Sequence, residues 1–237
     1  MLDRLRVLLT PSDEEDAWGY DPRFARTFEP LLDALYARWW NVKVTGPEHI
    51  PSAGPALIVA NRSAGEPWDG AMIATAIRRH GGRELRALGL DPLFSLPWAG
   101  TALRRAGALP SGASNARRLL ADGQLVLVAP EESREDTPYR VGRFGRGEFV
   151  EVALQAGAPI VACAVVAGGR LPLPGPLSLP ALPSSWRIEF GPPIDLSAYG
   201  PDAASDRRLV LEISDAVREQ LQAMVHENLI RRERPDR

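Results

Sequence analysis

The sequence predicts a single α/β domain with a central mixed, largely parallel sheet flanked by helices and preceded by an N-terminal helical segment. Short apolar runs of strand length alternate with stretches of helical periodicity, a pattern typical of a sheet with helices on its faces. The length of 237 residues suits one such domain and leaves little room for a second. We expect the helical segment to span residues 1–40 and the α/β domain residues 41–237.

The N-terminal helix is expected over residues 21–40, where large apolar side chains such as Phe24, Phe28 and Leu31 recur at helical spacing. Near its end, Trp39 and Trp40 follow a basic residue. Such an aromatic pair can sit in the headgroup region of a membrane. It can also be the seam that docks the helix on its domain, and we favour this second interpretation.

The remaining elements follow from apolar runs and turn signals. Strands are predicted at residues 42–44, 56–60, 85–88, 124–129, 160–166 and 186–190, and helical segments at 70–79, 116–121, 147–155 and 205–230. The Pro- and Leu-rich stretch at residues 171–183 is expected to be a loop that lies on the surface or lids a groove.

Composition excludes several classes of function. The formal net charge of −2 gives no indication of a nucleic-acid partner. The single cysteine, Cys163, lies inside an apolar run, so it is expected to be a buried small hydrophobe in a protein without a disulfide framework. No His, Cys and Asp residues cluster at ligand spacing, so no metal is expected.

The location of the protein is predicted from its apolar stretches. The first ten residues do not read as a signal peptide, and no stretch reaches the roughly 18 to 20 apolar residues that span a bilayer. We therefore expect a cytoplasmic protein. If it acts on lipids, it reaches them peripherally, at the inner membrane face.

Four sequence blocks in a fixed order resemble the glycerolipid acyltransferase superfamily, which includes lysophosphatidic acid acyltransferase. Residues 40–51 resemble the family's first strand and its G-x-E-x-I-P lead, and residues 54–61 the strand that delivers the N-H…D motif. Residues 119–131 resemble the lead into the P-E-G-T-R motif. Residues 144–147 and 156–161 resemble the K/R-x-G…A-G-x-P-I-V block. The resemblance covers most of residues 38–195.

This resemblance implies transfer of a fatty acyl group from acyl-CoA or acyl carrier protein to a lysophospholipid or other glycerolipid acceptor. The donor is a substrate, so no cofactor is implied, and the implied partners are the donor, the lipid acceptor and a membrane surface. In the family motif, a histidine oriented by an aspartate takes the proton of the attacking hydroxyl. The P-E-G-T-R motif is held to bind the acceptor's phosphate.

Carried over residue by residue, the family aspartate matches Asp69, and Arg62 stands in the position of the family histidine. Six residues separate them, whereas four is the commoner spacing. Arginine has no lone pair available at neutral pH and cannot act as the base. Losing a positioned base typically costs about 10²- to 10⁴-fold in rate. The neighbouring Asn61 and Ser63 are expected to contribute to substrate binding.

The P-E-G-T-R motif is altered as well. Glu131 and Arg134 are retained, Glu132 replaces the glycine, and Ser133 replaces the threonine. The resemblance assigns Glu131, Ser133 and Arg134 to substrate binding, across a groove from Arg62. The extra acidic residue weakens the case for a phosphate site. The other histidines, His49, His80 and His226, read as loop or helix-surface residues and offer no convincing base.

Three alternatives remain open from the sequence. The protein is an acyltransferase whose activity is weakened because Arg62 replaces the base. In the second alternative, the acceptor is an amine, which attacks a thioester without prior loss of a proton. In the third alternative, the protein is a catalytically inactive pseudoenzyme that binds acyl-CoA, lipid or a protein partner. Changes in both diagnostic motifs favour slow turnover or none.

Overall fold

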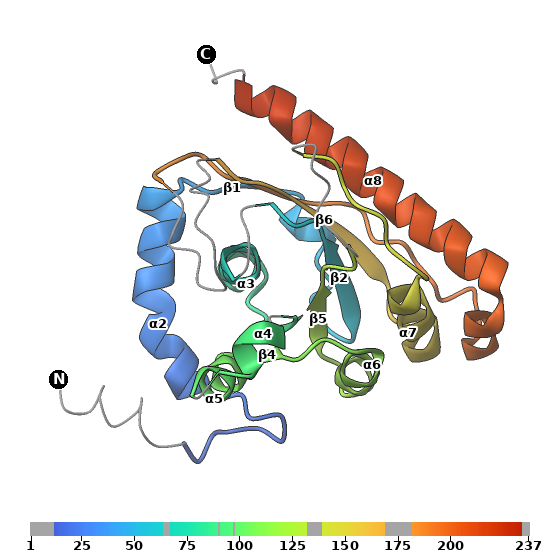
Figure 1. Cartoon of the computed structure of the whole chain (residues 1–237), viewed down its shortest axis with the longest axis horizontal. Coiled ribbons are helices and arrows are strands. Elements are labelled where there is room, and N and C mark those ends of the chain that lie inside the picture. Colours follow the sequence, from blue (N-terminus) through green and yellow to red (C-terminus); the bar gives the residue numbers. More distant parts are fainter. Residues whose placement is uncertain are drawn as a thin grey trace.

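A seven-stranded sheet organises the chain in the computed structural model, which describes residues 12–63, 67–89, 91–96, 98–131, 139–168 and 182–233 (Figure 1). Its strands are β1 (Lys43–Thr45), β2 (Ala56–Ala60), β3 (Leu85–Leu88), β4 (Ala108–Leu109), β5 (Leu125–Val128), β6 (Ile160–Val166) and β7 (Arg187–Phe190). They lie in the order β1-β7-β6-β2-β5-β3-β4.

The sheet is mixed and largely parallel, as predicted. Strands β4, β3, β5, β2 and β6 pair in parallel. Strand β7 pairs antiparallel with β6, and β1 pairs in parallel with β7. The carboxyl ends of these five parallel strands therefore meet at one edge of the sheet, which we call the carboxyl edge. Ligand sites in sheets of this kind usually lie beyond that edge.

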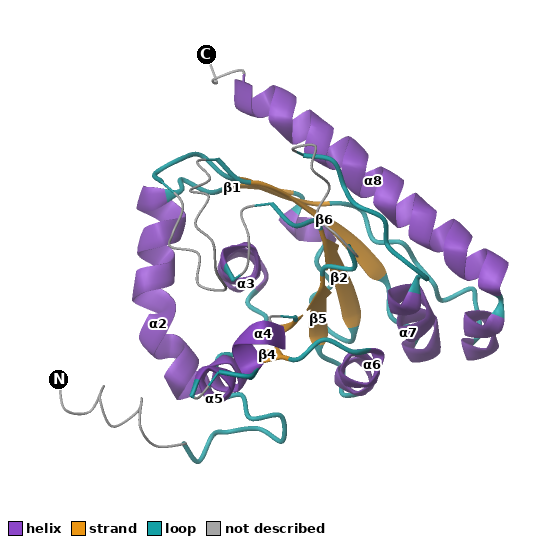
Figure 2. Cartoon of the chain, viewed as in Figure 1, coloured by secondary structure: helices purple, strands orange, loops and turns teal. Residues whose placement is uncertain are grey.

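Helices cover both faces of the sheet (Figure 2). The helical elements are α2 (Pro22–Ala34), a π-turn η1 (Leu35–Trp39), a 3₁₀ turn η2 (Pro47–His49), α3 (Trp68–Gly81), α4 (Asp91–Phe94), α5 (Ala99–Arg105), α6 (Ala113–Ala121), α7 (Glu148–Ala156), a 3₁₀ turn η3 (Pro201–Ser205) and α8 (Arg207–Glu233). Helices α2 and α3 lie on one side of the sheet, and α6, α7 and α8 lie on the other (Figure 1).

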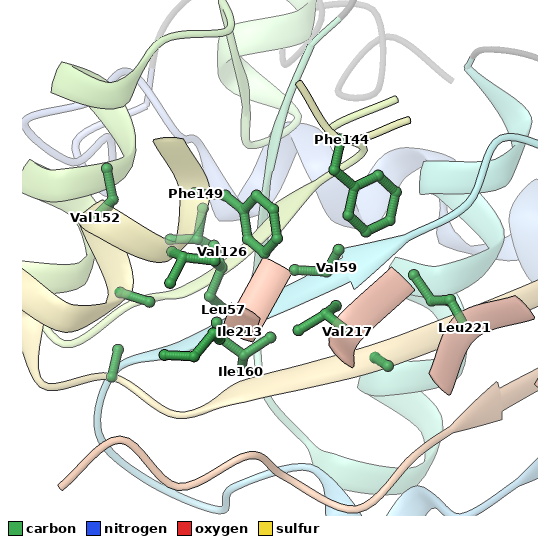
Figure 3. Close-up of a cluster of buried hydrophobic side chains, with 14 of the residues drawn as sticks. Leu57, Val59, Val126, Phe144, Phe149, Val152, Ile160, Ile213, Val217 and Leu221 are labelled. Carbon is green, nitrogen blue, oxygen red and sulfur yellow. The ribbon is translucent and has the colours of Figure 1, made fainter. Parts of the chain in front are cut away.

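Strand β2 shows why helices pack on both faces of the sheet. All five of its residues are buried, because side chains that alternate along a strand point to opposite faces. Leu57 and Val59 join the core under α6, α7 and α8, close to Phe149 and Val217 (Figure 3). Ile58 joins the second core under α3. The continuous apolar run read from the sequence is thus a strand buried on both faces.

The end of the N-terminal helix is anchored by tryptophans. The Trp40 side chain is fully buried and stacks on Trp186 with ring centroids 4.5 Å apart. It also meets Trp68 edge-on at 5.5 Å. The docking interpretation is therefore confirmed for Trp40. Its neighbour Trp39 is 43% exposed and is not part of this stack.

The start of α2 is fixed by a buried ion pair. Asp21 is the N-cap residue, and its carboxylate accepts the backbone N–H groups of Arg23 and Phe24. The same carboxylate accepts a 2.8 Å bond from the buried Arg105 guanidinium. Burial alone would raise the pKa of Asp21, but the hydrogen bonds from Arg105, Ser12 and Phe24 lower it to about 2.

The structure adds elements that the sequence pattern did not predict. Helices α4 and α5 and the two-residue strand β4 fill residues 91–109, and β7 runs antiparallel at one side of the sheet. Cys163 is buried as expected, and burial raises the pKa of its thiol. Within the described residues, no helix has the length and apolar character needed to cross a membrane. The expected domain boundary at residue 40 stays a prediction.

Candidate active site

The segment that follows β2 runs directly into the site predicted from the sequence. Asn61 is 7% exposed, and its carboxamide continues the β2–β6 ladder with side-chain atoms. Its Nδ2 donates to the Val165 carbonyl at 2.9 Å, and its Oδ1 accepts the Val165 N–H at 2.7 Å. One amide side chain thereby satisfies both backbone groups of a residue near the end of β6.

Ser63 extends the same connection by two residues. Its hydroxyl accepts the backbone N–H of Ala167 at 2.8 Å, just beyond the end of β6. Ser63 is 2% exposed, whereas the intervening Arg62 is exposed. Asn61 and Ser63 therefore hold the chain on either side of Arg62, whose side chain is left at the surface of the site. The contacts seen for Asn61 and Ser63 are with the protein backbone, and their predicted role in substrate binding stays a prediction.

Asp69 lies in the first turn of α3, where the helix dipole favours a carboxylate. Its Oδ2 accepts the backbone N–H of Ser63 at 2.7 Å. The carboxylate is 7% exposed. The structure thus brings Asp69 to the same segment as Arg62, and the bond ties the end of the β2 extension to the start of α3.

Glu131 approaches the same segment from β5. Its Oε1 accepts the backbone N–H of Arg62 at 3.2 Å, and the carboxylate is 5% exposed. Burial raises the pKa of Glu131, and the opposing hydrogen bonds from the Arg62 and Gly142 N–H groups do not fully offset it. Asp69 and Glu131 therefore accept consecutive backbone amides, those of Ser63 and Arg62. This arrangement fixes the backbone that carries Arg62.

A pocket of about 640 Å³ opens between the sheet and helices α6 and α7. Its apolar lining includes Leu57, Val128, Ala116, Phe144 and Phe149. The Phe144 and Phe149 rings meet edge-to-face, with centroids 5.6 Å apart, and lie over β2 in Figure 3. Such a lining can hold a hydrocarbon chain, because apolar ligand groups gain about 25 cal/mol for each Å² removed from water.

The four charged residues of the pocket lining come from three segments. Arg62 follows β2, Asp91 begins α4, and Arg146 and Glu148 lie at the start of α7. The Asp91 carboxylate accepts both the N–H and the hydroxyl of Ser111, which orients it. Of the residues predicted from the sequence, Arg62 alone lines this pocket within the described part of the chain.

Sequence reasoning missed part of this lining. The Phe144 and Arg146 positions lie in a block already matched to the family's K/R-x-G motif, so a signal for them was present. Asp91 and Ser111 had no such signal, since their contact depends on how the β3–α4 and β4–α6 connections meet. The predicted substrate-binding residues Ser133 and Arg134 lie outside the described residues, so the groove expected between Arg134 and Arg62 stays a prediction.

The described histidines lie away from the pocket lining. The Nδ1 atom of His49 lies 2.8 Å from the Phe190 carbonyl, and His80 is in the last turn of α3. His226 is on α8, beside Arg218 and Gln222. In the described ranges, no three His, Cys, Asp or Glu residues form a group that could hold a metal ion.

Comparison with known proteins identifies the family. The acyltransferase family model matches residues 41–166. An uncharacterized protein of Mycobacterium tuberculosis is 37% identical over 255 residues, which cover 94% of this chain and 71% of that protein. A Bos taurus protein named DGAT1/2-independent enzyme synthesizing storage lipids is 27% identical over 213 residues, which cover 84% of this chain and 64% of that protein.

A solved structure shows the same fold. The crystal structure of the 1-acyl-sn-glycerophosphate acyltransferase of Thermotoga maritima superposes with a TM-score of 0.58 at 18% identity, covering 93% of this chain and 88% of that chain. The α/β architecture is therefore that of this acyltransferase. With a family model that spans strands β1 to β6 and a relative 37% identical along nearly the whole chain, the protein belongs to the acyltransferase family.

Proposed function

We propose that the protein transfers a fatty acyl group from acyl-CoA or acyl carrier protein to a lysophospholipid or other glycerolipid acceptor, with slow turnover on hydroxyl acceptors. The observation that carries this proposal is the pocket itself. An apolar lining large enough for part of an acyl chain meets the exposed Arg62 at the carboxyl edge of an acyltransferase domain. The storage-lipid relative supports a glycerolipid as the acceptor class.

The reaction needs one bond formed and one broken. The acceptor oxygen or nitrogen attacks the thioester carbonyl carbon, the carbon–sulfur bond breaks, and the acceptor's proton ends on the released thiol. Arg62 cannot remove that proton, because a guanidinium stays protonated at neutral pH. Its N–H groups can instead donate to the carbonyl oxygen as negative charge develops there. Positioning of the two substrates then supplies the remaining rate enhancement.

Slow turnover follows from the composition of the lining. Among the described residues that line the pocket, none is a histidine, and neither Asp69 nor Glu131 is included. Both carboxylates accept backbone N–H groups of the Arg62 segment instead. Transfer to a hydroxyl acceptor is therefore slowed by the lack of a base, whereas transfer to a neutral amine is slowed far less.

A thiol-release assay tests the proposal. Purified protein is incubated with long-chain acyl-CoA and either lysophosphatidic acid, a diacylglycerol or a long-chain amine, and free thiol and acylated product are both measured. Acceptor-dependent thiol release with matching acylated product supports the proposal. Absence of product with every acceptor and with an acyl carrier protein donor would overturn it.

The same lining favours one alternative, a protein that binds acyl-CoA or lipid without turnover. The apolar lining of the pocket can bind a lipid or acyl ligand. If Arg62 replaces the general base, the protein can hold that ligand without converting it. Binding of acyl-CoA, measured by calorimetry, with no product from any acceptor would identify this case.

A further inference from the structure

We propose that the carboxyl edge of the sheet is the surface that docks on a phospholipid bilayer, and that Leu96 and Trp98 form its principal anchor. The inference goes beyond the proposed function, and rests on it only in explaining why a lipid surface should lie beside this site. Two exposed tryptophans, Trp98 and Trp39, mark the two ends of the edge. Each has an exposed leucine as its companion.

The first anchor lies in the connection that leaves β3 at its carboxyl end. Trp98 is 88% exposed, and Leu96 beside it is 40% exposed. Indole and leucine side chains are costly to leave in water, and tryptophan is favoured where an apolar body meets a polar surface. Asp91, the first residue of α4 in the same connection, lines the pocket. The anchor and the pocket therefore share one segment of chain.

The backbone at Trp98 adopts an uncommon conformation. Its φ of 63° lies in the left-handed region, which glycine adopts readily and which is unfavourable for a residue with a bulky side chain. Such strain persists only where the surroundings impose it, and it gathers at functional positions. The hairpin of α4 and α5 is tight, because a Cβ atom at Gly100 would come within 2.9 Å of the Phe94 carbonyl oxygen. Leu93 is buried and anchors the hairpin to the domain.

The second anchor lies at the other end of the same edge. Strand β7 is antiparallel to β6, so its first residue, Arg187, is level with Val166 at the carboxyl end of β6. Lys43 of β1 is level with Arg187. Trp39, four residues before Lys43, accepts the Ser184 N–H on its carbonyl at 3.1 Å, which places it at this edge.

The companion leucine and the charges of the edge fit an anionic lipid surface. Leu182, two residues before Ser184, is 52% exposed. Arg38, Lys43 and Arg62 are exposed along the same edge and supply positive charge. Basic residues interleaved with tryptophan and leucine are the composition that binds anionic lipid headgroups. Docked in this way, the lipid surface would face the segment that carries Arg62.

Vesicle co-sedimentation tests the surface without requiring turnover. The full chain is mixed with vesicles of phosphatidylcholine, with and without phosphatidylglycerol, and the bound fraction is measured. We expect Trp98→Ser to lower the partition coefficient by about tenfold and Leu96→Ser to lower it less. Tyr199→Ser is the matched control and should leave partition unchanged, because Tyr199 is 42% exposed and follows Ile194, whose bridge to Ile160 lies at the opposite, amino end of β6.

A labelled variant keeps the test independent of the loss of an apolar side chain. Because Cys163 is fully buried, a fluorescent thiol reagent should label Leu96→Cys selectively. The emission of the label should shift to shorter wavelength when vesicles are added, and the emission of the same label on Tyr199→Cys, near the opposite end of β6, should not.

Three outcomes would overturn the inference. One is equal partition of the wild type and Trp98→Ser. Another is loss of partition in Leu31→Ser, on the exposed side of α2, with Trp98→Ser unaffected. The third is a dimer that Trp98→Ser dissociates, in a protein that binds no vesicles. Failure of the proposed function looks different, since a protein that releases no thiol can still bind vesicles through Trp98.

Discussion

The carboxylate of Glu131 accepts the backbone N–H of Arg62 at 3.2 Å, across 69 residues of sequence, and so ties the end of β5 to the extension of β2. With Asp69 on the next amide, two buried carboxylates fix the backbone at the position where the sequence resemblance predicts the family's histidine. The carboxylates therefore act on the chain that carries Arg62, and Arg62 itself lines the pocket.

Glu131 should make the protein less stable as the pH rises. Its pKa is raised in the folded state, so the folded protein holds this proton to a higher pH than the unfolded chain does. Its contribution to stability therefore falls once the pH exceeds the ordinary value of 4.5. Urea unfolding of Glu131→Gln should show no such decline, since the amide keeps an acceptor oxygen and carries no charge.

Two comparisons complete that test. Glu131→Ala removes the acceptor for the Arg62 N–H and should lower the free energy of unfolding by about 1–3 kcal/mol. Glu219→Gln, at an exposed carboxylate on α8, should leave the pH dependence unchanged. A decline with pH that survives in Glu131→Gln would contradict the assignment.

The Asp21–Arg105 pair should dominate acid unfolding of the N-terminal region. Because the pKa of Asp21 is lowered from 3.8 to about 2, its contribution is fully present above pH 4 and is lost as the pH falls toward 2. This linkage amounts to about 2 kcal/mol. Asp21→Asn should cost about 3 kcal/mol at pH 7, because it leaves the buried Arg105 guanidinium without its counter-charge.

The control for that variant is an exposed ion pair between Arg23, in the first turn of α2, and Glu14 in the preceding segment. Glu14→Gln removes the carboxylate that pairs with Arg23. The Glu14 and Arg23 side chains are 41% and 53% exposed, so the variant should lower the free energy of unfolding by less than about 1 kcal/mol. Equal losses from the buried and the exposed pair, measured by urea denaturation, would argue against a structural role for Asp21.

Asn61→Ala should destabilise the protein by about 2 kcal/mol. The variant leaves the buried N–H and carbonyl of Val165 without partners, and each unsatisfied buried group is costly. Hydrogen exchange at the Val165 amide should quicken more than exchange at the Val161 amide in the middle of β6. An unchanged melting temperature would show that Asn61 is available for a ligand and is not needed by the fold.

The two adjacent tryptophans at the end of the N-terminal helix should behave differently. Trp40→Ala should cost about 3–5 kcal/mol, because the side chain is fully buried against Trp186 and Trp68. Trp39→Ala should cost less than about 1 kcal/mol, since that side chain is 43% exposed. Thermal denaturation of both variants measures the two losses of stability. Similar losses for Trp40→Ala and Trp39→Ala would contradict the stacking of Trp40 described above.

Much of the fold could be predicted because its strands are short and fully apolar. The runs at residues 56–60 and 160–166 became β2 and β6, and the order of motifs was enough to suggest the family. The order of the strands and the antiparallel direction of β7 could not be predicted from the sequence, because strand pairing depends on contacts between distant segments. The two-residue β4 is too short to leave a periodic pattern.

The site could be predicted only in part for the same reason. The motif predicted that Arg62 and Asp69 lie close together. In the structure, Asp69 accepts the backbone N–H of Ser63, the residue next to Arg62. The sequence gave no indication that Asn61 would bond to the backbone of Val165 or that Glu131 would accept the Arg62 amide. These bonds are set by how β2, β5 and β6 lie beside one another, which local composition does not encode.

The central claim is that Arg62 stands where the family uses its base. The most direct measurement compares the rates at which wild type, Arg62→His and Arg62→Ala transfer an acyl group from acyl-CoA to lysophosphatidic acid and to an amine. We expect slow transfer to the hydroxyl by wild type and about 10²-fold faster transfer by Arg62→His, with a smaller change for the amine. Wild-type transfer to the hydroxyl that falls in both variants would contradict the claim, because Arg62 would then belong to a fully working site.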